Sequence, residues 1–555
     1  MNALDRTHVL HTLFVRLLWI SIIFFYVQSA SASPNSEPRV TGISGVLLKN
    51  VLARLATEER PNSENIRQAL EPFGYFSPII YTFPTHYHIL PGPQLRIHRV
   101  NFYITGAGKH HPAFQKLREN FPIKQGQPFS SINYEAAKKS LLDAAEKEGF
   151  LTPIFTEHRV LVDLKKYIST IILHFDTGPR SYFGTIYFQE NPLSPDFLKR
   201  YASFKPGEPY SEEKVTAFQT ALNQSTYFKQ VSIERKITQT QSIPLKVNLI
   251  PQKARQYSMG VGYGTDTSVR MSLGVDWTRL TRWGHRFSGL FRFSPVQNSI
   301  QAAYIIPGER PLAEQYSINA SLFRTLFPQG KSMTQKLGIA QLKKMGFWEQ
   351  TLEINYQRER SHLNQQPHYD SHLILPSIRW QYLKSDNLVY PSYGQRFNLK
   401  IQGASQILFS DTNLLQIKIE HKYIHRVTPE GRILLRGALG YTAVQNLDRL
   451  PLTLHFFAGG TQSVRGYTYQ SLGPGRSLLV GSLEYQHRIK GNWNAAIYYD
   501  IGNAFNKMQS LKLRQGMGVG IVWVSPIGPI NVSVAKALSL PGQPLQLQFS
   551  MGADL

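Results

Sequence analysis

The sequence predicts an α+β region followed by an all-β domain: three small α/β modules, then a 16-stranded antiparallel transmembrane β-barrel. Residues 34 to about 255 repeat a pattern of amphipathic helices and strands, whereas from about Gln256 the apolar residues recur at every second position. After the N-terminus no stretch reaches 18 apolar residues, so a crossing of the membrane would use strands and not helices.

The N-terminus has the layout of a secretory signal peptide. Arg6 and Arg16 precede an apolar run of about 11 residues, Leu17 to Val27, and small residues follow up to Ala32. The run is shorter than the roughly 20 residues of a membrane anchor, which is the alternative interpretation. We therefore predict a signal peptide over residues 1–32, with cleavage after Ala32.

Export limits the partners that the composition allows. The chain has no cysteine, so no disulfide framework is expected, and its 61 basic and 36 acidic side chains give a net charge of +25. An exported chain is not expected to bind nucleic acid. The basic excess could instead meet anionic lipid headgroups or lipopolysaccharide, although a solvated surface explains it equally well.

A weak internal repeat predicts three modules, over residues 33–94, 95–180 and 181–255. Helical patterns end near Gly74, Gly149 and Thr226, a period of about 75 residues. Units two and three also share the segments FPIKQGQPF and FKPGEPY, each followed by a serine suited to cap a helix. Each unit is predicted to hold a strand, two helices and further strands. The first unit is the shortest and lacks the Gly-x-Pro segment.

Residues 256–555 alternate as the strands of a lipid-facing barrel do. In the segment 269–277, Val, Met, Leu, Val and Trp alternate with Arg, Ser, Gly and Asp. The alternative, a soluble β-sandwich, usually has strands of only about 5 or 6 residues. Turns divide the domain into about 16 strands, and a barrel of that size needs a plug or becomes a pore.

A connection of about 30 residues, Gln445 to Arg476, separates predicted strands 11 and 12. Connections of this length are usually functional or disordered. This one contains Arg465 within the run Val464, Arg465, Gly466 and Tyr467. Alternation on the next two strands places Glu484 and Asp500 on the lumen wall. If the loop folds inward, Arg465 meets both carboxylates, and in a hydrated lumen we expect this pair to contribute about 1 to 3 kcal/mol. The alternative is an exposed loop with an unpaired arginine.

The first strand carries Gly260, Gly262 and Gly264 on one face, and it must close against the last strand, which contains Phe549. Glycine weakens strand pairing, so this seam could open laterally and template an incoming strand. Alternatively, the glycine row makes room for the plugging loop.

The segment SVRGY resembles the Val-Arg-Gly-Tyr/Phe loop motif of the BamA/TamA outer-membrane superfamily, and YYDIG at 498–502 and GMGVGIVWVSPIGPI at 516–530 strengthen the resemblance. It implies periplasmic POTRA modules before a 16-stranded barrel in the bacterial outer membrane. It also implies that the loop arginine, here Arg465, contacts the acidic wall residues Glu484 and Asp500. The chain departs from the common pattern in ending on Leu555 and not on an aromatic residue.

Three modules and a length near 550 residues resemble the TamA branch more than BamA or the two-partner secretion transporters. This resemblance implies a TamB-like partner anchored in the inner membrane. Its implied clients are unfolded outer-membrane proteins such as autotransporters, and outer-membrane lipids surround the barrel. No cofactor is implied.

Two other classes of function compete with an assembly factor. For an enzyme, GMGVG at 516–520 imitates a nucleotide loop but precedes no helix, and the histidines at 86–88 and 110–111 have no acidic or cysteine ligands nearby. We therefore predict no catalytic residue, metal site or cofactor. A passive porin or a two-partner-secretion-type pore would explain the barrel but would leave three modules without a role.

Overall fold

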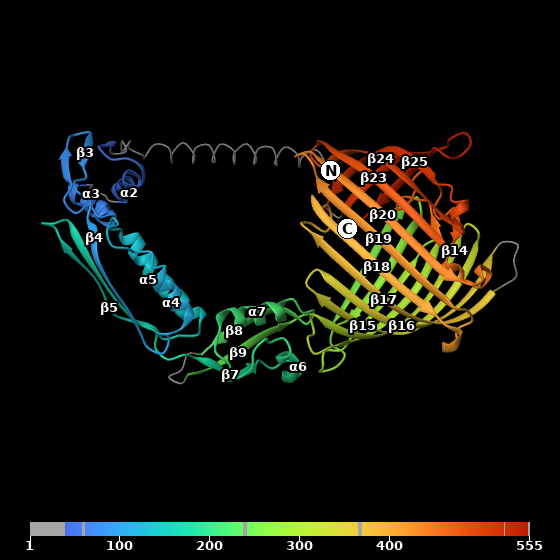
Figure 1. Cartoon of the computed structure of the whole chain (residues 1–555), viewed down its shortest axis with the longest axis horizontal. Coiled ribbons are helices and arrows are strands. Elements are labelled where there is room, and N and C mark those ends of the chain that lie inside the picture. Colours follow the sequence, from blue (N-terminus) through green and yellow to red (C-terminus); the bar gives the residue numbers. More distant parts are fainter. Residues whose placement is uncertain (1–38, 58–61, 237–240, 364–368, 527, 553–555) are drawn as a thin grey trace, which may run out of the picture. The chain divides into compact units, whose positions relative to one another are not determined.

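The computed structural model describes residues 39–57, 62–236, 241–363, 369–526 and 528–552 (Figure 1). The predicted signal peptide lies outside these residues. Among the described residues, no helix is both long and apolar enough to cross a membrane.

Each module contains the predicted strand, two helices and two further strands. The first holds β1 (Arg39–Thr41), α2 (Gly45–Ala56), α3 (Ser63–Leu70), β2 (Ile79–Thr82) and β3 (His86–Leu90). The second holds β4 (Arg96–Thr105), α4 (Pro112–Glu119), α5 (Ser131–Lys147), β5 (Ile154–Asp163) and β6 (Ile168–Asp176). The third holds β7 (Tyr182–Phe188), α6 (Pro195–Lys199), α7 (Glu212–Asn223), β8 (Phe228–Arg235) and β9 (Ser242–Pro251).

The last strand of each module lies in the middle of its sheet, with orders β1-β3-β2, β4-β6-β5 and β7-β9-β8. In the first two modules this strand pairs in parallel with the first strand and antiparallel with the other. The two outer strands of every sheet therefore each have a free edge within the module.

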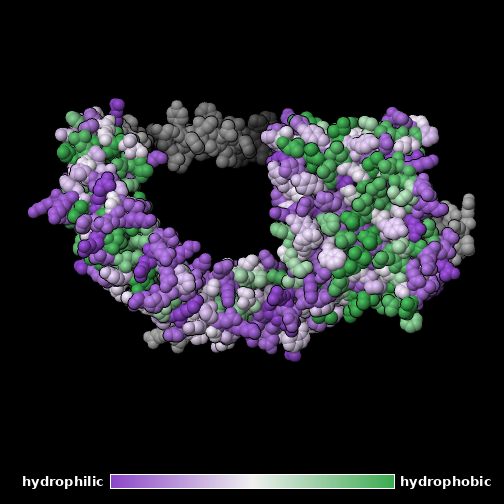
Figure 2. Space-filling model, in the orientation of Figure 1, coloured by the Kyte–Doolittle hydropathy of each residue, from purple (hydrophilic) through white to green (hydrophobic). Residues whose placement is uncertain are grey.

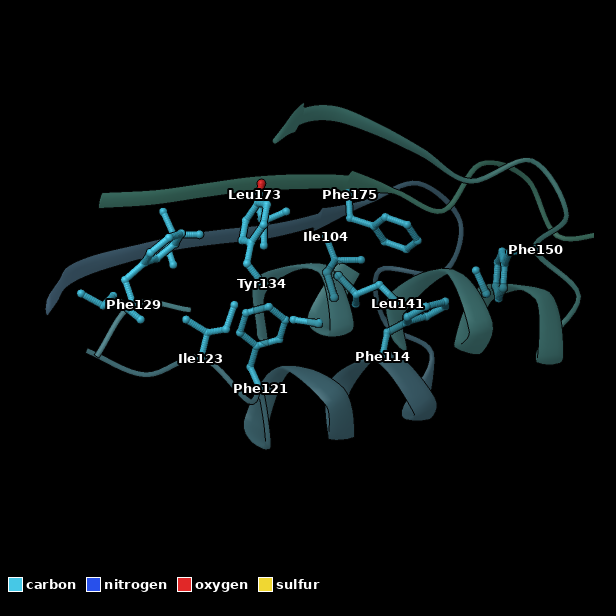
Figure 3. Packing of buried hydrophobic residues seen from close by; sticks show 14 of the residues in the cluster. Ile104, Phe114, Phe121, Ile123, Phe129, Tyr134, Leu141, Phe150, Leu173 and Phe175 are labelled. Carbon is cyan, nitrogen blue, oxygen red and sulfur yellow. The ribbon is translucent and has the colours of Figure 1, made fainter. Parts of the chain in front are cut away.

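The second module shows how the helices are held (Figure 3). Phe114 of α4 and Leu141 of α5 are buried against Leu173 and Phe175 of β6, and all four are fully inaccessible. The side chain of Ser130 caps α5 by accepting a hydrogen bond from the amide of Asn133 at 3.4 Å. Burial of one apolar helical face thus orients both helices on the sheet.

The glycines of the internal repeat end helical segments. Gly74 and Gly149 both have φ of +86°, a left-handed conformation that is common just after a helix and that other residues rarely adopt. At Gly149 a Cβ would also collide with the carbonyl oxygen of Tyr210. The repeat in the sequence therefore reflects a turn that the backbone needs.

The predicted barrel of 16 antiparallel strands is confirmed. One sheet runs in the order β10 to β20 and then β23 to β27. Its first eight strands are β10 (Arg255–Gly264), β11 (Ser268–Trp277), β12 (Arg286–Phe293), β13 (Gln297–Pro307), β14 (Glu314–Phe327), β15 (Gly330–Met345), β16 (Trp348–Leu363) and β17 (Tyr369–Ser385). The other eight are β18 (Tyr393–Ala404), β19 (Leu414–Arg426), β20 (Gly431–Val444), β23 (Ser477–Lys490), β24 (Trp493–Phe505), β25 (Arg514–Ser525), β26 (Gly528–Ala537) and β27 (Leu545–Met551).

The two faces of the barrel wall differ as the alternation predicts. Apolar side chains gather on the outside of the strands (Figure 2), where Tyr257 and Met259 of β10 are 75% and 72% exposed. Polar side chains such as Gln357, Glu359 and Thr442 point to the lumen side and are buried. An apolar exterior matches a hydrocarbon environment.

The barrel closes weakly where β10 meets β27. These two strands are the ends of the sheet order, and the described residues form no ladder between them. In the part of the chain that the structure describes, three hydrogen bonds join them, all through Thr265 just after β10. Its amide and hydroxyl donate to the Phe549 carbonyl at 3.1 and 3.3 Å, and the Phe549 amide donates to the hydroxyl at 3.2 Å.

Candidate functional site

The loop between β20 and β23 packs inside the barrel and has structure of its own, although no strand period is visible in this part of the sequence. Two 3₁₀ turns, Leu447–Arg449 and Leu452–Leu454, lead into β21 (Phe456–Ala458), which pairs with β22 (Leu472–Gly475). Wall residues hold this part of the loop: Gln416 of β19 donates to the carbonyl of Leu454 in the second 3₁₀ turn at 2.7 Å, and Phe456 of β21 packs against Leu478.

The tip of this loop brings Arg465 to both acidic residues of the wall. Nη1 of Arg465 donates to Glu484 Oε2 at 2.5 Å. Nε and Nη2 donate to the two carboxylate oxygens of Asp500 at 2.7 and 2.8 Å, and the Arg465 amide donates to Asp500 at 3.0 Å. Only a guanidinium can make this two-pronged contact with one carboxylate while reaching a second.

The ion cluster of Arg465, Glu484 and Asp500 is more deeply buried than it would be in a water-filled lumen. Arg465, Glu484 and Asp500 are 3%, 5% and 0% exposed, and the guanidinium carbon lies 3.4 Å from the ring centre of Tyr498. Burial by itself would lower the pKa of Arg465, but the hydrogen bond to Asp500 and the charge of Glu484 raise it above its ordinary value. Removal of one partner from a buried pair of this kind costs about 3 to 5 kcal/mol, more than the screened pair that the sequence suggested.

Arg436 of β20 adds a second cation that the sequence reasoning did not single out. Its Nη2 lies 3.7 Å from Asp500 Oδ1 and donates to Ser482 at 2.9 Å, and its Nη1 donates to the Thr461 carbonyl at 3.2 Å. Two guanidinium groups thus face two carboxylates. Alternation along β20 could have placed Arg436 on the lumen face, but it does not show that the loop reaches it.

The residues beside Arg465 fit against the wall. Val464 is fully buried and Tyr467 is 3% exposed, both in an apolar cluster with Leu478 and Ala537. Gly466 has φ of +90°, and a Cβ there would lie 3.0 Å from backbone atoms of β26. A side chain at this position would push the loop from the wall.

Gly516, in the segment that imitates a nucleotide loop, has a packing role. A Cβ added there would collide with the carbonyl oxygen of Arg465. This strand position has to be glycine because the backbone of the loop lies directly on it.

We expect Gly516→Ala to destabilise the barrel by about 1 to 3 kcal/mol, the usual cost of overpacking. The measurement is the urea midpoint of unfolding in detergent micelles. Gly437→Ala is the matched control, because its Cβ would meet nothing closer than 3.9 Å. Equal midpoints for the two variants would contradict the close approach of the loop.

A second contact ties the loop to the turn between β10 and β11. The amide and hydroxyl of Thr461 donate to Asp266 Oδ2 at 2.8 and 2.6 Å. Asp266 is next to Thr265, which makes the seam hydrogen bonds. Burial raises the pKa of Asp266, while the hydrogen bonds from Thr461 and the charge of Arg270 act in the opposite direction.

We expect Asp266→Ala to speed amide hydrogen exchange at residues 459–470 by roughly tenfold or more, since hydrogen bonds to a charged group are worth about 1.5 to 3 kcal/mol. Asp411→Ala removes an aspartate that accepts from the His372 amide at 2.5 Å and, among the described residues, makes no hydrogen bond to residues 459–470. Exchange as fast in Asp411→Ala as in Asp266→Ala would refute a specific hold on the loop.

The glycine row of β10 faces the lumen but does not contact the loop. A Cβ at Gly260 would meet Ser272 Oγ at 2.6 Å, one at Gly262 would meet Arg270 at 3.8 Å, and one at Gly264 would meet the Phe549 carbonyl at 3.6 Å. The nearest atoms belong to β11 and β27. On the outer face Phe549 packs on Tyr263, with ring centres 5.7 Å apart. A methyl group at any of these three positions would therefore lie more than 4 Å from the loop or meet other atoms first.

In the sequence, three α/β modules precede a 16-stranded antiparallel barrel, and one loop of the barrel folds into its lumen. These features define a class of membrane β-barrels with N-terminal α/β modules. The chain belongs to the Omp85 superfamily, whose domain model matches residues 200–554. It is an outer-membrane β-barrel with periplasmic POTRA modules.

Similar curated proteins include two named outer membrane protein assembly factor BamA. The one from Nitratidesulfovibrio vulgaris is 21% identical over 62% of this chain and 48% of its own length. The one from Neisseria meningitidis serogroup B is 20% identical over 69% of this chain and 57% of its own length. The chain thus spans about half the length of the curated relatives it matches.

A solved structure agrees with the fold. The crystal structure of BamA from Haemophilus ducreyi lacking POTRA domains 1–3 superimposes with a TM-score of 0.71 at 16% identity, over 82% of this chain and 99% of that chain.

Proposed function

We propose that this chain is an outer-membrane protein assembly factor, not an enzyme, that helps to insert client barrels. The observation that carries the proposal is the combination of a loop folded into the lumen with a wall whose described residues close through three hydrogen bonds at one residue, Thr265. A plugged lumen is unsuited to free diffusion, whereas a weak seam gives access to strand edges.

The seam supplies the chemistry of insertion. When β10 and β27 separate, each presents unpaired backbone N–H and C=O groups, which an incoming strand can satisfy by β-augmentation. Gly260, Gly262 and Gly264 have no side chains that could pack against β27 on the lumen face and hold the seam closed. The client strand exchanges water for backbone partners without leaving an unsatisfied group in the hydrocarbon.

The loop around Arg465 acts in this proposal as an internal latch. It is bound to β23 and β24 through Glu484 and Asp500, and to the turn beside the seam through Asp266. Gly466 and Tyr467 keep it against β25 and β26. A loop that is bound to all these strands maintains the shape of the barrel while the seam opens.

In this proposal the modules bind clients or a partner in the periplasm. Their outer strands have free edges that can pair with an unfolded client or a partner. The resemblance of the sequence to the TamA branch favours a TamA-like role with autotransporter clients and a TamB-like inner-membrane partner. Photo-activated cross-linkers placed on β2 and β5 in cells test this: capture of an inner-membrane-anchored protein supports the TamA-like role, and capture of soluble or outer-membrane partners alone opposes it.

Reconstitution tests the proposed function itself. Liposomes that contain the full chain are mixed with an unfolded autotransporter barrel, and insertion is followed by protease protection and heat-resistant gel migration. We expect insertion at least several-fold faster than in empty liposomes. Equal rates, together with a large and steady single-channel conductance, would favour a passive porin or a two-partner-secretion-type pore.

A further inference from the structure

A large cavity inside the barrel has no role in the function proposed above. Its volume is about 710 Å³, and it lies between the wall strands β10 to β14 and the hairpin of the loop. Its cationic side chains are Arg270 of β11, Arg292 of β12 and Lys418 of β19, and Ser272, Gln297 and Tyr469 are among its hydrogen-bonding groups. None of the described residues that line it is an aspartate or a glutamate.

Two of these cations are available to a ligand. Lys418 is paired with Glu420 at 2.7 Å. Within the described part of the chain, however, Arg270 and Arg292 make no ion pair or side-chain hydrogen bond, and both are exposed to the lumen. Asp266 interacts electrostatically with Arg270, but its carboxylate accepts hydrogen bonds from the amide and hydroxyl of Thr461.

The register brings the two guanidinium groups together. Ser272 lies opposite Arg292, so Arg270 is the diagonal neighbour of Arg292 on the same face of the sheet. Diagonal neighbours of this kind are about 7 to 8 Å apart, within reach of long side chains. Two like charges so placed favour an anion between them, and guanidinium groups bind phosphate oxygens in pairs.

The position of the cavity indicates where the phosphate comes from. Gly260 and Gly262 of β10 and Met551 of β27 line it, so it borders both strands of the seam. The two glycines leave the lumen side of β10 bare, and the outer side carries Met259 and Val261, both exposed to the membrane. A lipid at the seam can therefore keep its acyl chains outside while its headgroup enters the cavity.

We propose that this cavity binds the headgroup of an anionic, phosphate-bearing membrane lipid, with Arg270 and Arg292 holding the phosphate. The seam then admits a lipid headgroup and also offers strand edges to which a client strand can pair. The site does not depend on the insertion of client proteins, and its occupancy is measured without a client.

The test uses the full chain in nanodiscs of phosphatidylcholine that contain a photoactivatable phosphatidylglycerol with its reactive group near the phosphate. We expect cross-links to the cavity wall and to the loop near Tyr469, located by mass spectrometry. The double variant Arg270→Gln with Arg292→Gln should lose about tenfold or more of this labelling, because it removes both charge-assisted contacts to the phosphate. Arg379→Gln with Lys400→Gln is the control, since these cations line a different cavity.

Three results would overturn the proposal: equal labelling of the double variant and wild type, equal labelling by a phosphatidylcholine probe, or loss of labelling in millimolar inorganic phosphate. The last would identify a site for free phosphate. Heat-dependent gel migration checks that the variants are folded. If the double variant is not folded, Arg292→Gln alone carries the test, with several-fold lower labelling expected and unchanged labelling refuting the site.

Discussion

Arg465→Ala is expected to lower the free energy of unfolding of the barrel by about 3 to 5 kcal/mol, because it leaves Glu484 and Asp500 buried without their main counter-charge. The yield of folded barrel and the assembly of clients should fall with it. Unfolding in urea, followed by tryptophan fluorescence in micelles, gives the size of the loss.

Two further variants separate the ion cluster from a general effect of mutating the loop. Arg449→Ala removes an exposed arginine of the same loop and should leave stability within about 0.5 kcal/mol of wild type. Asp500→Asn added to Arg465→Ala should recover part of the lost free energy of unfolding, because it removes one buried carboxylate that has no counter-charge. Arg465→Ala with the stability and yield of Arg449→Ala would refute the latch.

A disulfide across the seam is expected to reduce client insertion at least tenfold while the barrel remains folded. Tyr263→Cys with Phe549→Cys is suitable, because the two side chains contact each other on the outer face of β10 and β27. Under oxidation β10 cannot leave β27, so neither strand edge is available to a client. Insertion into liposomes is measured before and after reduction, which should restore it.

The matched control is a disulfide that shares Tyr263→Cys but does not cross the seam. Val269 lies directly opposite Tyr263 in the β10–β11 ladder, so Tyr263→Cys with Val269→Cys staples two strands that stay paired. This variant should insert clients equally well in both redox states. Unchanged insertion with the seam locked would exclude lateral opening.

Much of the architecture could be predicted because it depends on local periodicity. A strand has a side-chain period of two, so alternation assigned Glu484 and Asp500 to the lumen face without knowledge of the barrel. The helix ends at Gly74 and Gly149 repeat for a similarly local reason, since both need a left-handed backbone. The parts of the site that escaped prediction are pairings across long separations. Thr461 and Asp266 are 195 positions apart, and Gly516 meets Arg465 through backbone packing.

By itself, the sequence determined which residues face the lipid, how many strands and modules form, and which loop carries Arg465 next to several glycines. These properties follow from residue type and spacing along the chain. Only the tertiary structure decided that Arg465 is buried with Arg436 beside it and that the loop is tied to the turn next to the seam. It also decided that two arginines share a cavity whose described lining residues include no acid. The physical reason is that burial and charge pairing depend on strand register and on the path of the loop through the lumen, which neighbouring residues do not specify.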